Sequence, residues 1–181
     1  MSYSVQNIRN VCLLGHSGNG KTALAESLLY MTGAIDRMGR GADGNTVCDY
    51  DPEETKRQIS ISTAVAPLEY KGCRINVLDT PGYFDFSGEV MEGLRVADAG
   101  IIVGSAKGGL SVGTEKAWKY LQERNMPRAI YIAKTDEENG DFIIGAVEGV
   151  PGAYETVGIE SPGLSAAPAI AKMLVGQIAA D

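Results

Sequence analysis

The chain has 181 residues, 44% of them hydrophobic, which is enough for one globular domain with a substantial core. Its formal charge of −7 disfavours nonspecific binding to DNA, to other nucleic-acid phosphates and to anionic membranes. No segment approaches the ~20 apolar residues of a membrane span or forms a signal peptide, so we expect a cytoplasmic protein. Cys12, Cys48 and Cys73 lie far apart, which favours reduced thiols over a zinc site.

The first part of the chain predicts a strand, a glycine-rich loop and a helix. Residues 11–14 form a short apolar run, and after the turn Leu24, Leu28 and Met31 recur at helical spacing. Residues 33–58 are rich in glycine and charged residues and have no sustained apolar period. We therefore predict a long, mobile surface loop there, and a loop of this length is more often functional than idle.

The middle of the chain predicts strands and helices in alternation. Residues 59–70 and 74–78 are β-branched and apolar and are joined by a short turn, which is typical of an antiparallel hairpin. The patterns that follow predict a helix, a strand, a helix and a strand over residues 87–97, 99–103, 113–124 and 129–133. This alternation predicts an α/β fold with a mostly parallel sheet, helices on both faces and ligand loops at the carboxyl ends of its strands.

The turn after the first strand carries a phosphate-binding motif. It fits the pattern G-x-x-x-x-G-K-[ST] directly after a predicted strand and directly before a predicted helix, which identifies the fold as a P-loop NTPase. Lys21 would reach the β and γ phosphates of a nucleoside triphosphate, and Thr22 would ligate Mg²⁺. The predicted phosphate contacts are Gly15, His16, Ser17, Gly18, Asn19, Gly20, Lys21 and Thr22.

Two alternatives apply to this motif. A glycine-rich turn that holds no ligand would fit the same spacing, but the Lys-Thr pair would have no packing purpose in such a turn. His16 is the only histidine, and a catalytic role for it is one interpretation. We favour the other, in which His16 contributes its backbone to the loop and packs its ring nearby.

Two further motifs follow later strands. Asp79 and Gly82, in Asp-Thr-Pro-Gly, would bind a magnesium-held water and the γ-phosphate. Lys134 would cover a guanine ring while Asp136 accepts two N–H groups from its edge. Taken alone, the first motif is equally a common turn and the second a pair of surface charges. The offset of the first behind the phosphate-binding motif favours a nucleotide site.

These elements in this order resemble the GTPase domain of the translation elongation factor G family over residues 7–139. The stretches that look like the family, and like its elongation-factor-G-like branch, are GHSGNGKT, LLYMTGAIDRMGR, DYDPEETKRQISIS, INVLDTPGYFDFSGEV and ADAGIIVGSAKGGLSVGTEKAW. The resemblance implies binding of guanine nucleotide, as GTP and GDP, with Mg²⁺, and it implies GTP hydrolysis and the ribosome as a partner. By position, Lys21 and Tyr83 would be catalytic, and Thr22, Ser60 and Asp79 would hold the metal.

Several positions depart from the family's pattern. Ser60 stands where the family usually has threonine, and its hydroxyl can ligate Mg²⁺ equally. Tyr83 stands where the family has the histidine that positions the attacking water. This predicts either slow hydrolysis, because a phenol is a poor general base, or another arrangement that orients the water. Ala133 replaces an asparagine that braces the base, which predicts weaker selection of guanine over adenine.

The end of the chain departs further. A full elongation factor G continues through domains that contact the ribosome, so we expect most ribosome-binding parts to be absent here. Residues 141–181 instead look like the C-terminal segment of flavin-dependent glycerol-3-phosphate and 2-hydroxyacid oxidoreductases, which suggests a chimera. We expect no flavin, because the G-x-G-x-x-G half that would grip a dinucleotide is missing.

We divide the chain into a GTPase domain at residues 1–140 and a segment at residues 141–181 that completes the same domain. A strand at residues 154–159 and a helix at residues 166–179 would replace the last strand and helix of a GTPase, with Ser161 near the guanine. The favoured function is a slow GTPase switch. The alternatives are a nucleotide-binding module without useful turnover, an ATP-using P-loop enzyme and, last, a flavin enzyme.

Overall fold

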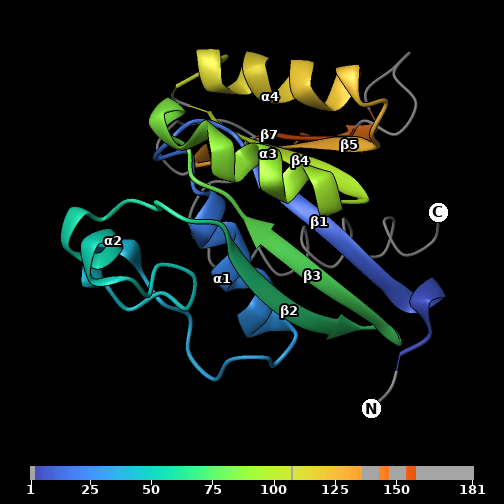
Figure 1. Cartoon of the computed structure of the whole chain (residues 1–181), viewed down its shortest axis with the longest axis horizontal. Coiled ribbons are helices and arrows are strands. Elements are labelled where there is room, and N and C mark those ends of the chain that lie inside the picture. The colour runs from blue at the N-terminus through green and yellow to red at the C-terminus, as the bar shows by residue number, and fades with distance from the viewer. Residues whose placement is uncertain (1–2, 107, 136–142, 147–153, 158–181) are drawn as a thin grey trace.

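A five-stranded sheet lies at the centre of the computed structural model, which describes residues 3–106, 108–135, 143–146 and 154–157. The strand order is β2-β3-β1-β4-β5, and neighbours run parallel except for the antiparallel pair of β2 and β3 (Figure 1). The strands are β1 (Ile8–Leu14), β2 (Ala64–Tyr70), β3 (Cys73–Asp79), β4 (Ala99–Ser105) and β5 (Arg128–Ala133). The predicted α/β fold with a mostly parallel sheet is confirmed.

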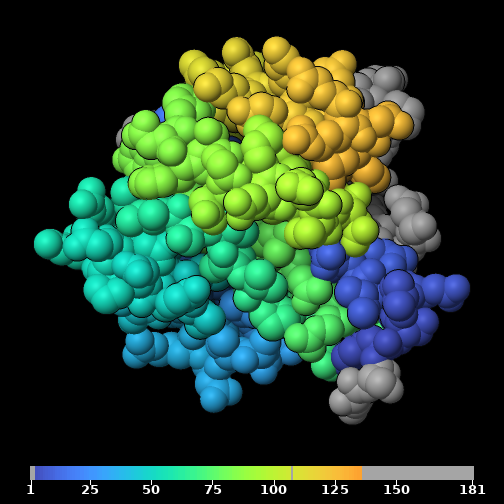
Figure 2. Space-filling model, in the orientation of Figure 1, coloured from blue at the N-terminus to red at the C-terminus, as the bar shows by residue number. Residues whose placement is uncertain are grey.

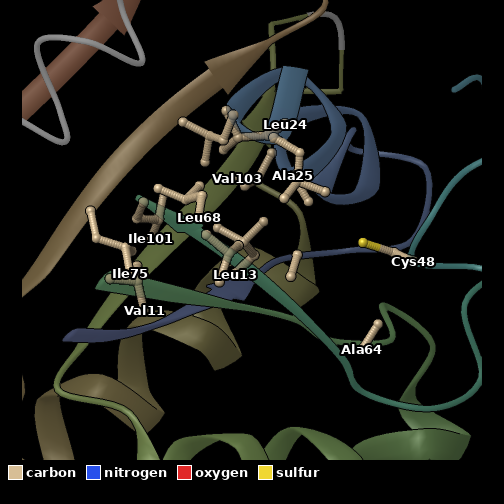
Figure 3. Close-up of a cluster of buried hydrophobic side chains, with 14 residues drawn as sticks. Val11, Leu13, Leu24, Ala25, Cys48, Ala64, Leu68, Ile75, Ile101 and Val103 are labelled. Carbon is tan, nitrogen blue, oxygen red and sulfur yellow. The ribbon is translucent and has the colours of Figure 1, made fainter. Parts of the chain in front are cut away.

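Helices cover both faces of this sheet, because successive side chains of each buried strand point to opposite faces. Leu13 of β1 packs with Leu24 of α1 on one face (Figure 3), whereas Leu14 packs with Leu94 of α3 and Leu121 of α4 on the other. The covering helices are α1 (Lys21–Met31), α3 (Ser87–Val96) and α4 (Val112–Glu123). Each face therefore has its own apolar cluster, and the loops between the layers meet at the carboxyl ends of the strands.

The predicted hairpin is confirmed, but its first strand begins later than predicted. Lys71 and Gly72 form its turn with φ values of +48° and +80°, the left-handed pair that matches the twist of an antiparallel hairpin. The strand prediction began at residue 59, whereas β2 begins at Ala64. The N–H groups of residues 61–63 donate to glutamate side chains instead of to a neighbouring strand, which explains the later start.

The prediction of an irregular loop at residues 33–58 is wrong in part, because this stretch contains the helix α2 (Pro52–Arg57) and the 3₁₀ turn η2 (Gly41–Asp43). Asp51 caps α2 in a capping box with Glu54, and six residues are too few to show a helical period. Cys48 is buried against the α1 face of the sheet. We call residues 39–63 the first segment; in Figure 2 it is cyan to teal and abuts the light green of α3.

The last described strands, β6 (Ile143–Ala146) and β7 (Tyr154–Val157), form an antiparallel pair. β7 lies beside β5 (Figure 1) and falls within the strand predicted at residues 154–159. The helix predicted at residues 166–179 lies outside the described residues. The remaining short elements are η1 (Val5–Asn7) and η3 (Phe84–Phe86). Within the described part of the chain, every helix is too short or too polar to cross a membrane.

Candidate nucleotide site

Two residues of the loop between β1 and α1 lie against the same carbonyl oxygen of β4. Gly15 has a φ of +138°, and a Cβ there would overlap the carbonyl oxygen of Val103, so glycine is the residue that fits. Asn19 is buried and donates from Nδ2 to the same carbonyl oxygen at 2.9 Å. The carboxyl end of β4 therefore sets the shape of the predicted phosphate loop.

Lys21 begins α1 and turns its ammonium back over this loop. Its Nζ donates to the carbonyl oxygens of Gly15 and His16, each at 3.0 Å, and the residue is 5% exposed. Burial lowers the pKa of Lys21, while the nearby carboxylates of Asp79 and Asp49 act in the opposite direction. A buried cation above a ring of backbone groups is the arrangement that binds phosphate oxygens.

Thr22, Ser60 and Asp79, the three predicted metal ligands, meet beside this loop although they come from α1, from the connection between α2 and β2, and from the end of β3. The Thr22 hydroxyl donates to Asp79 Oδ2 at 2.7 Å, and Thr22 Oγ1 lies 3.3 Å from Ser60 Oγ. Asp79 Oδ1 is buried without a hydrogen-bond partner among the described residues. Burial raises the pKa of Asp79, and the hydrogen bond from Thr22 and the charge of Lys21 oppose that rise.

This donor set fits Mg²⁺. An orphaned carboxylate oxygen and two hydroxyl groups are hard oxygen ligands, and Mg²⁺ is usually bound by one or two carboxylates together with substrate phosphates and water. The described residues contain no group of three or more His, Cys, Asp or Glu side chains that would form a protein cage for a metal. The site therefore suits a cation that arrives with phosphate.

A cleft of about 410 Å³ opens between the phosphate loop and the first segment, which is within the size range of ligand pockets. The loop and Gly82 line one side, and Met38, Arg40, Asp49 and Ser60 line the other. Of these, Met38, Arg40 and Asp49 were missed by the sequence predictions. Asp49 is a partly buried carboxylate, and burial raises its pKa. A single acidic residue in a polar stretch carries no periodic signal that would have found it.

Residues 80–86, the second segment, lie directly on the phosphate loop. A Cβ at Gly82 would stand 2.5 Å from Lys21 Nζ and 2.6 Å from Ser17 Cα, so the backbone of Gly82 faces the place where a terminal phosphate would bind. Thr80 fixes the start of this segment by donating to the Leu13 carbonyl oxygen at 2.6 Å. Tyr83 follows and is 43% exposed.

His16 packs its ring in the manner favoured from the sequence. The ring lies 5.9 Å from that of Phe84, and a Cβ at Gly113 of α4 would stand 2.8 Å from His16 Cα. Lys116 of α4 places its ammonium 3.9 Å from the centre of the Phe84 ring. These contacts tie the phosphate loop, the second segment and α4 together.

The structure describes only part of the predicted base-binding end of the site. β5 ends at Ala133, whose Cβ lies 3.4 Å from the position of a Cβ on Gly20, so the strand end approaches the phosphate loop. Lys134 follows with a φ of +59°. Asp136 and Ser161, the other predicted guanine contacts, lie outside the described residues.

Comparisons with known proteins give matches over most of the chain. Residues 6–153 match the family described as Elongation factor Tu GTP binding domain. Elongation factor G 2 of Borreliella burgdorferi is 40% identical over 144 residues, which are 78% of this chain and 22% of that protein. The elongation factor G-like protein of Mycobacterium tuberculosis is 43% identical over 135 residues, which are 75% of this chain and 19% of that protein.

A solved structure from Thermus thermophilus matches with a TM-score of 0.72 at 31% identity, and the match covers 96% of this chain and 31% of that one. These relatives support the predicted resemblance to the GTPase domain of the elongation factor G family. The chain spans about a fifth of the length of the curated relatives. The family match also continues beyond residue 140, where the sequence predictions placed a boundary.

Proposed function

Because the chain belongs to the elongation factor Tu GTP-binding domain family, we propose that it binds GTP and GDP with Mg²⁺ and hydrolyses GTP slowly. The observation that carries the proposal is the meeting of Thr22, Ser60 and Asp79 beside the phosphate loop. Thr22 belongs to α1, Asp79 ends β3 and Ser60 lies between α2 and β2, so separate parts of the chain supply the three side chains. Mg²⁺, when bound, neutralises charge on the phosphates and polarises them for attack.

The residues of the site have separate roles in this proposal. Lys21 leaves the carbonyl oxygens of its own loop and pairs with the β and γ phosphates. The Gly82 N–H donates to the γ-phosphate. Tyr83 borders the place from which water attacks phosphorus, breaking the bond to the β-phosphate oxygen and releasing GDP and phosphate. Lys134 and Asp136 select guanine.

Replacing Lys21 tests the nucleotide site. Lys21→Ala should weaken GTP binding by at least about a hundredfold, because it removes the charge-assisted hydrogen bonds to the phosphates. Lys119→Ala, on the exposed side of α4, is the matched control and should leave the affinity unchanged. Equal GTP affinities for Lys21→Ala and the unchanged chain, measured by titration calorimetry, would remove the basis of the proposal.

Base choice and turnover need separate measurements. A competition titration with GDP, GTP, ADP and ATP should rank both guanine nucleotides first, and equal competition by ATP would favour an ATP-using enzyme. Phosphate release in excess GTP, with and without ribosomes, separates a GTPase from a module that binds without turnover. The exposed phenol at position 83 favours that second candidate. Faster release with ribosomes would support the ribosome as a partner.

We also propose that residues 141–181 complete the same domain, serving as a strand and a helix and not as part of a flavin site. The position of β7 beside β5 supports this. Removing residues 141–181 should then cost solubility and nucleotide binding together. A shortened chain that stays stable, soluble and able to bind GTP would contradict the proposal, and a yellow, flavin-containing protein would contradict the absence of flavin.

A further inference from the structure

Glu54 of α2 is a buried carboxylate that three backbone N–H groups bind. Its Oε1 accepts from Ile61 at 2.9 Å and from Ser62 at 3.0 Å, and its Oε2 accepts from Asp51 at 3.2 Å. The residue is 2% exposed. A buried carboxylate is costly unless hydrogen bonds or a cation satisfy it, so these three bonds are what keep it in place.

In the part of the chain that the structure describes, no lysine or arginine forms an ion pair with Glu54. The ion pairs found among the described residues lie on the exposed faces of α2 and α4 and do not include it. Its donors include the two residues that directly follow Ser60 in the chain. The carboxylate therefore acts on the backbone next to a predicted metal ligand.

The path of the backbone brings the residues on both sides of Ser60 back to Glu54. α2 ends at Gln58 with a φ of +54°, which turns the chain back along the helix, and the Ile59 N–H then donates to the Glu54 carbonyl oxygen at 3.2 Å. Glu54 thus binds the chain on both sides of Ser60, through its carbonyl before it and its carboxylate after it. Between these points the Ser60 hydroxyl lies 3.3 Å from Thr22 Oγ1.

We propose that Glu54 is a positioning residue that holds Ser60 at the metal site, so that its hydrogen bonds to Ile61 and Ser62 set the Mg²⁺ affinity of the nucleotide complex. This rests on the proposed function, because it requires that Mg²⁺ bind with GTP beside Thr22. Glu54 itself touches neither ligand. Its loss should act only through the freedom that Ser60 gains.

The test is a Mg²⁺ titration of the full chain with the non-hydrolysable analogue GppNHp. Glu54→Ala should raise the Mg²⁺ concentration for half-maximal GppNHp binding about tenfold, the size of one lost charge-assisted hydrogen bond. Affinity for the analogue in EDTA should not change. A merely structural role would instead lower both affinities together, and that result would overturn the proposal.

Two variants make the test independent of folding. Asp51→Ala removes the cap of α2 but keeps the bonds to Ile61 and Ser62, so its Mg²⁺ dependence should match the unchanged chain. Glu54→Asp keeps the charge but withdraws the oxygens by one methylene, so it should show the raised Mg²⁺ requirement even if Glu54→Ala does not fold. Equal shifts in Asp51→Ala and Glu54→Asp would mean that helix stability is responsible.

A double variant asks whether Glu54 acts through Ser60. Ser60→Ala should raise the Mg²⁺ requirement, and adding Glu54→Ala to it should cause no further rise, whereas independent effects would multiply. A further rise contradicts the proposal. If the unchanged chain binds no GppNHp at any Mg²⁺ concentration, the proposed function fails as well. If it binds with a Mg²⁺ requirement that Glu54→Asp leaves unaltered, only the role of Glu54 fails.

Discussion

The first segment, residues 39–63, is held by carboxylates of α1, of α3 and of its own helix α2, whereas the second segment, residues 80–86, rests on the phosphate loop through Gly82 and exposes aromatic rings. In the first, Glu26 of α1, Glu54 of α2 and Glu89 of α3 accept backbone N–H groups of the segment. In the second, Tyr83 and Phe84 are each more than 40% exposed. Both segments border the same loop.

The two segments differ in the kind of contact that holds them, because hydrogen bonds hold the first and close packing holds the second. A carboxylate that accepts N–H groups fixes both distance and angle, whereas a close van der Waals contact fixes only distance. We therefore expect the first segment to keep its shape with and without nucleotide. We expect the second segment to change its conformation when a terminal phosphate binds between Gly82 and Lys21.

Glu26→Ala should have the largest effect, because it removes hydrogen bonds that hold the first segment. Glu26 is fully buried and accepts from Gly39 at 2.8 Å and from Val47, and the alanine would leave both N–H groups without their acceptor. We expect the free energy of unfolding to fall by about 3 kcal/mol. Denaturant unfolding of the nucleotide-free chain measures this change in the free energy of unfolding.

Cys48 supplies a second measurement on this variant. The residue is 2% exposed, and burial raises the pKa of its thiol, so the thiol should resist thiol reagents until the first segment opens. Glu26→Ala should speed its labelling. The control is Glu53→Ala, whose exposed ion pairs with Lys56 and Arg57 contribute little. If both variants behave alike, the buried carboxylate does not hold the segment.

Gly82→Ala should disturb the second segment without loosening the first. The new Cβ would press on Lys21 Nζ and the Ser17 backbone, and overpacking of this kind costs about 2 kcal/mol, so we expect GTP affinity to fall about thirtyfold. Calorimetric titration measures this. Gly88→Ala is the matched control, because nothing lies within 4 Å of a Cβ there. An unchanged affinity in Gly82→Ala would mean that the segment can move away freely.

Tyr83→His should have the smallest effect and should change rate without changing affinity. If water orientation limits hydrolysis, the imidazole should raise phosphate release about tenfold, while GDP affinity stays constant. Tyr50→His makes the same exchange at an exposed position of the first segment and should change neither quantity. A rate that does not rise in Tyr83→His would place the limit elsewhere, at the Mg²⁺ site or at product release.

Local and periodic features of the site could be predicted from the sequence. The phosphate motif works through backbone groups, so its spacing alone places Lys21 and Thr22. The alternating apolar runs likewise predict a sheet covered by helices, because burial on both faces leaves a signal along each strand. Asp79 and Gly82 could be predicted because they lie at the end of a predicted strand, behind the phosphate-binding motif.

The interior of the first segment could not be predicted in this way. Glu26 and Glu54 look like surface residues in the sequence, since glutamate is rarely buried and nothing local marks the N–H groups that it will accept. α2 is too short to show a period. The late start of β2 has the same origin, because Ile61 and Ser62 donate their N–H groups to the side chain of Glu54.

The antiparallel direction of β2 has a consequence for the path of the chain. α1 begins at the phosphate loop and runs away from it, so Met31 lies at the opposite end of the sheet. A parallel β2 would start at that far end, whereas the observed strand starts at Ala64, paired with Asp79 at the ligand end. The connection must therefore travel back along the whole molecule before re-entering the sheet. The reversal of one strand is thus what brings the first segment back to the phosphate loop, where it lines the cleft.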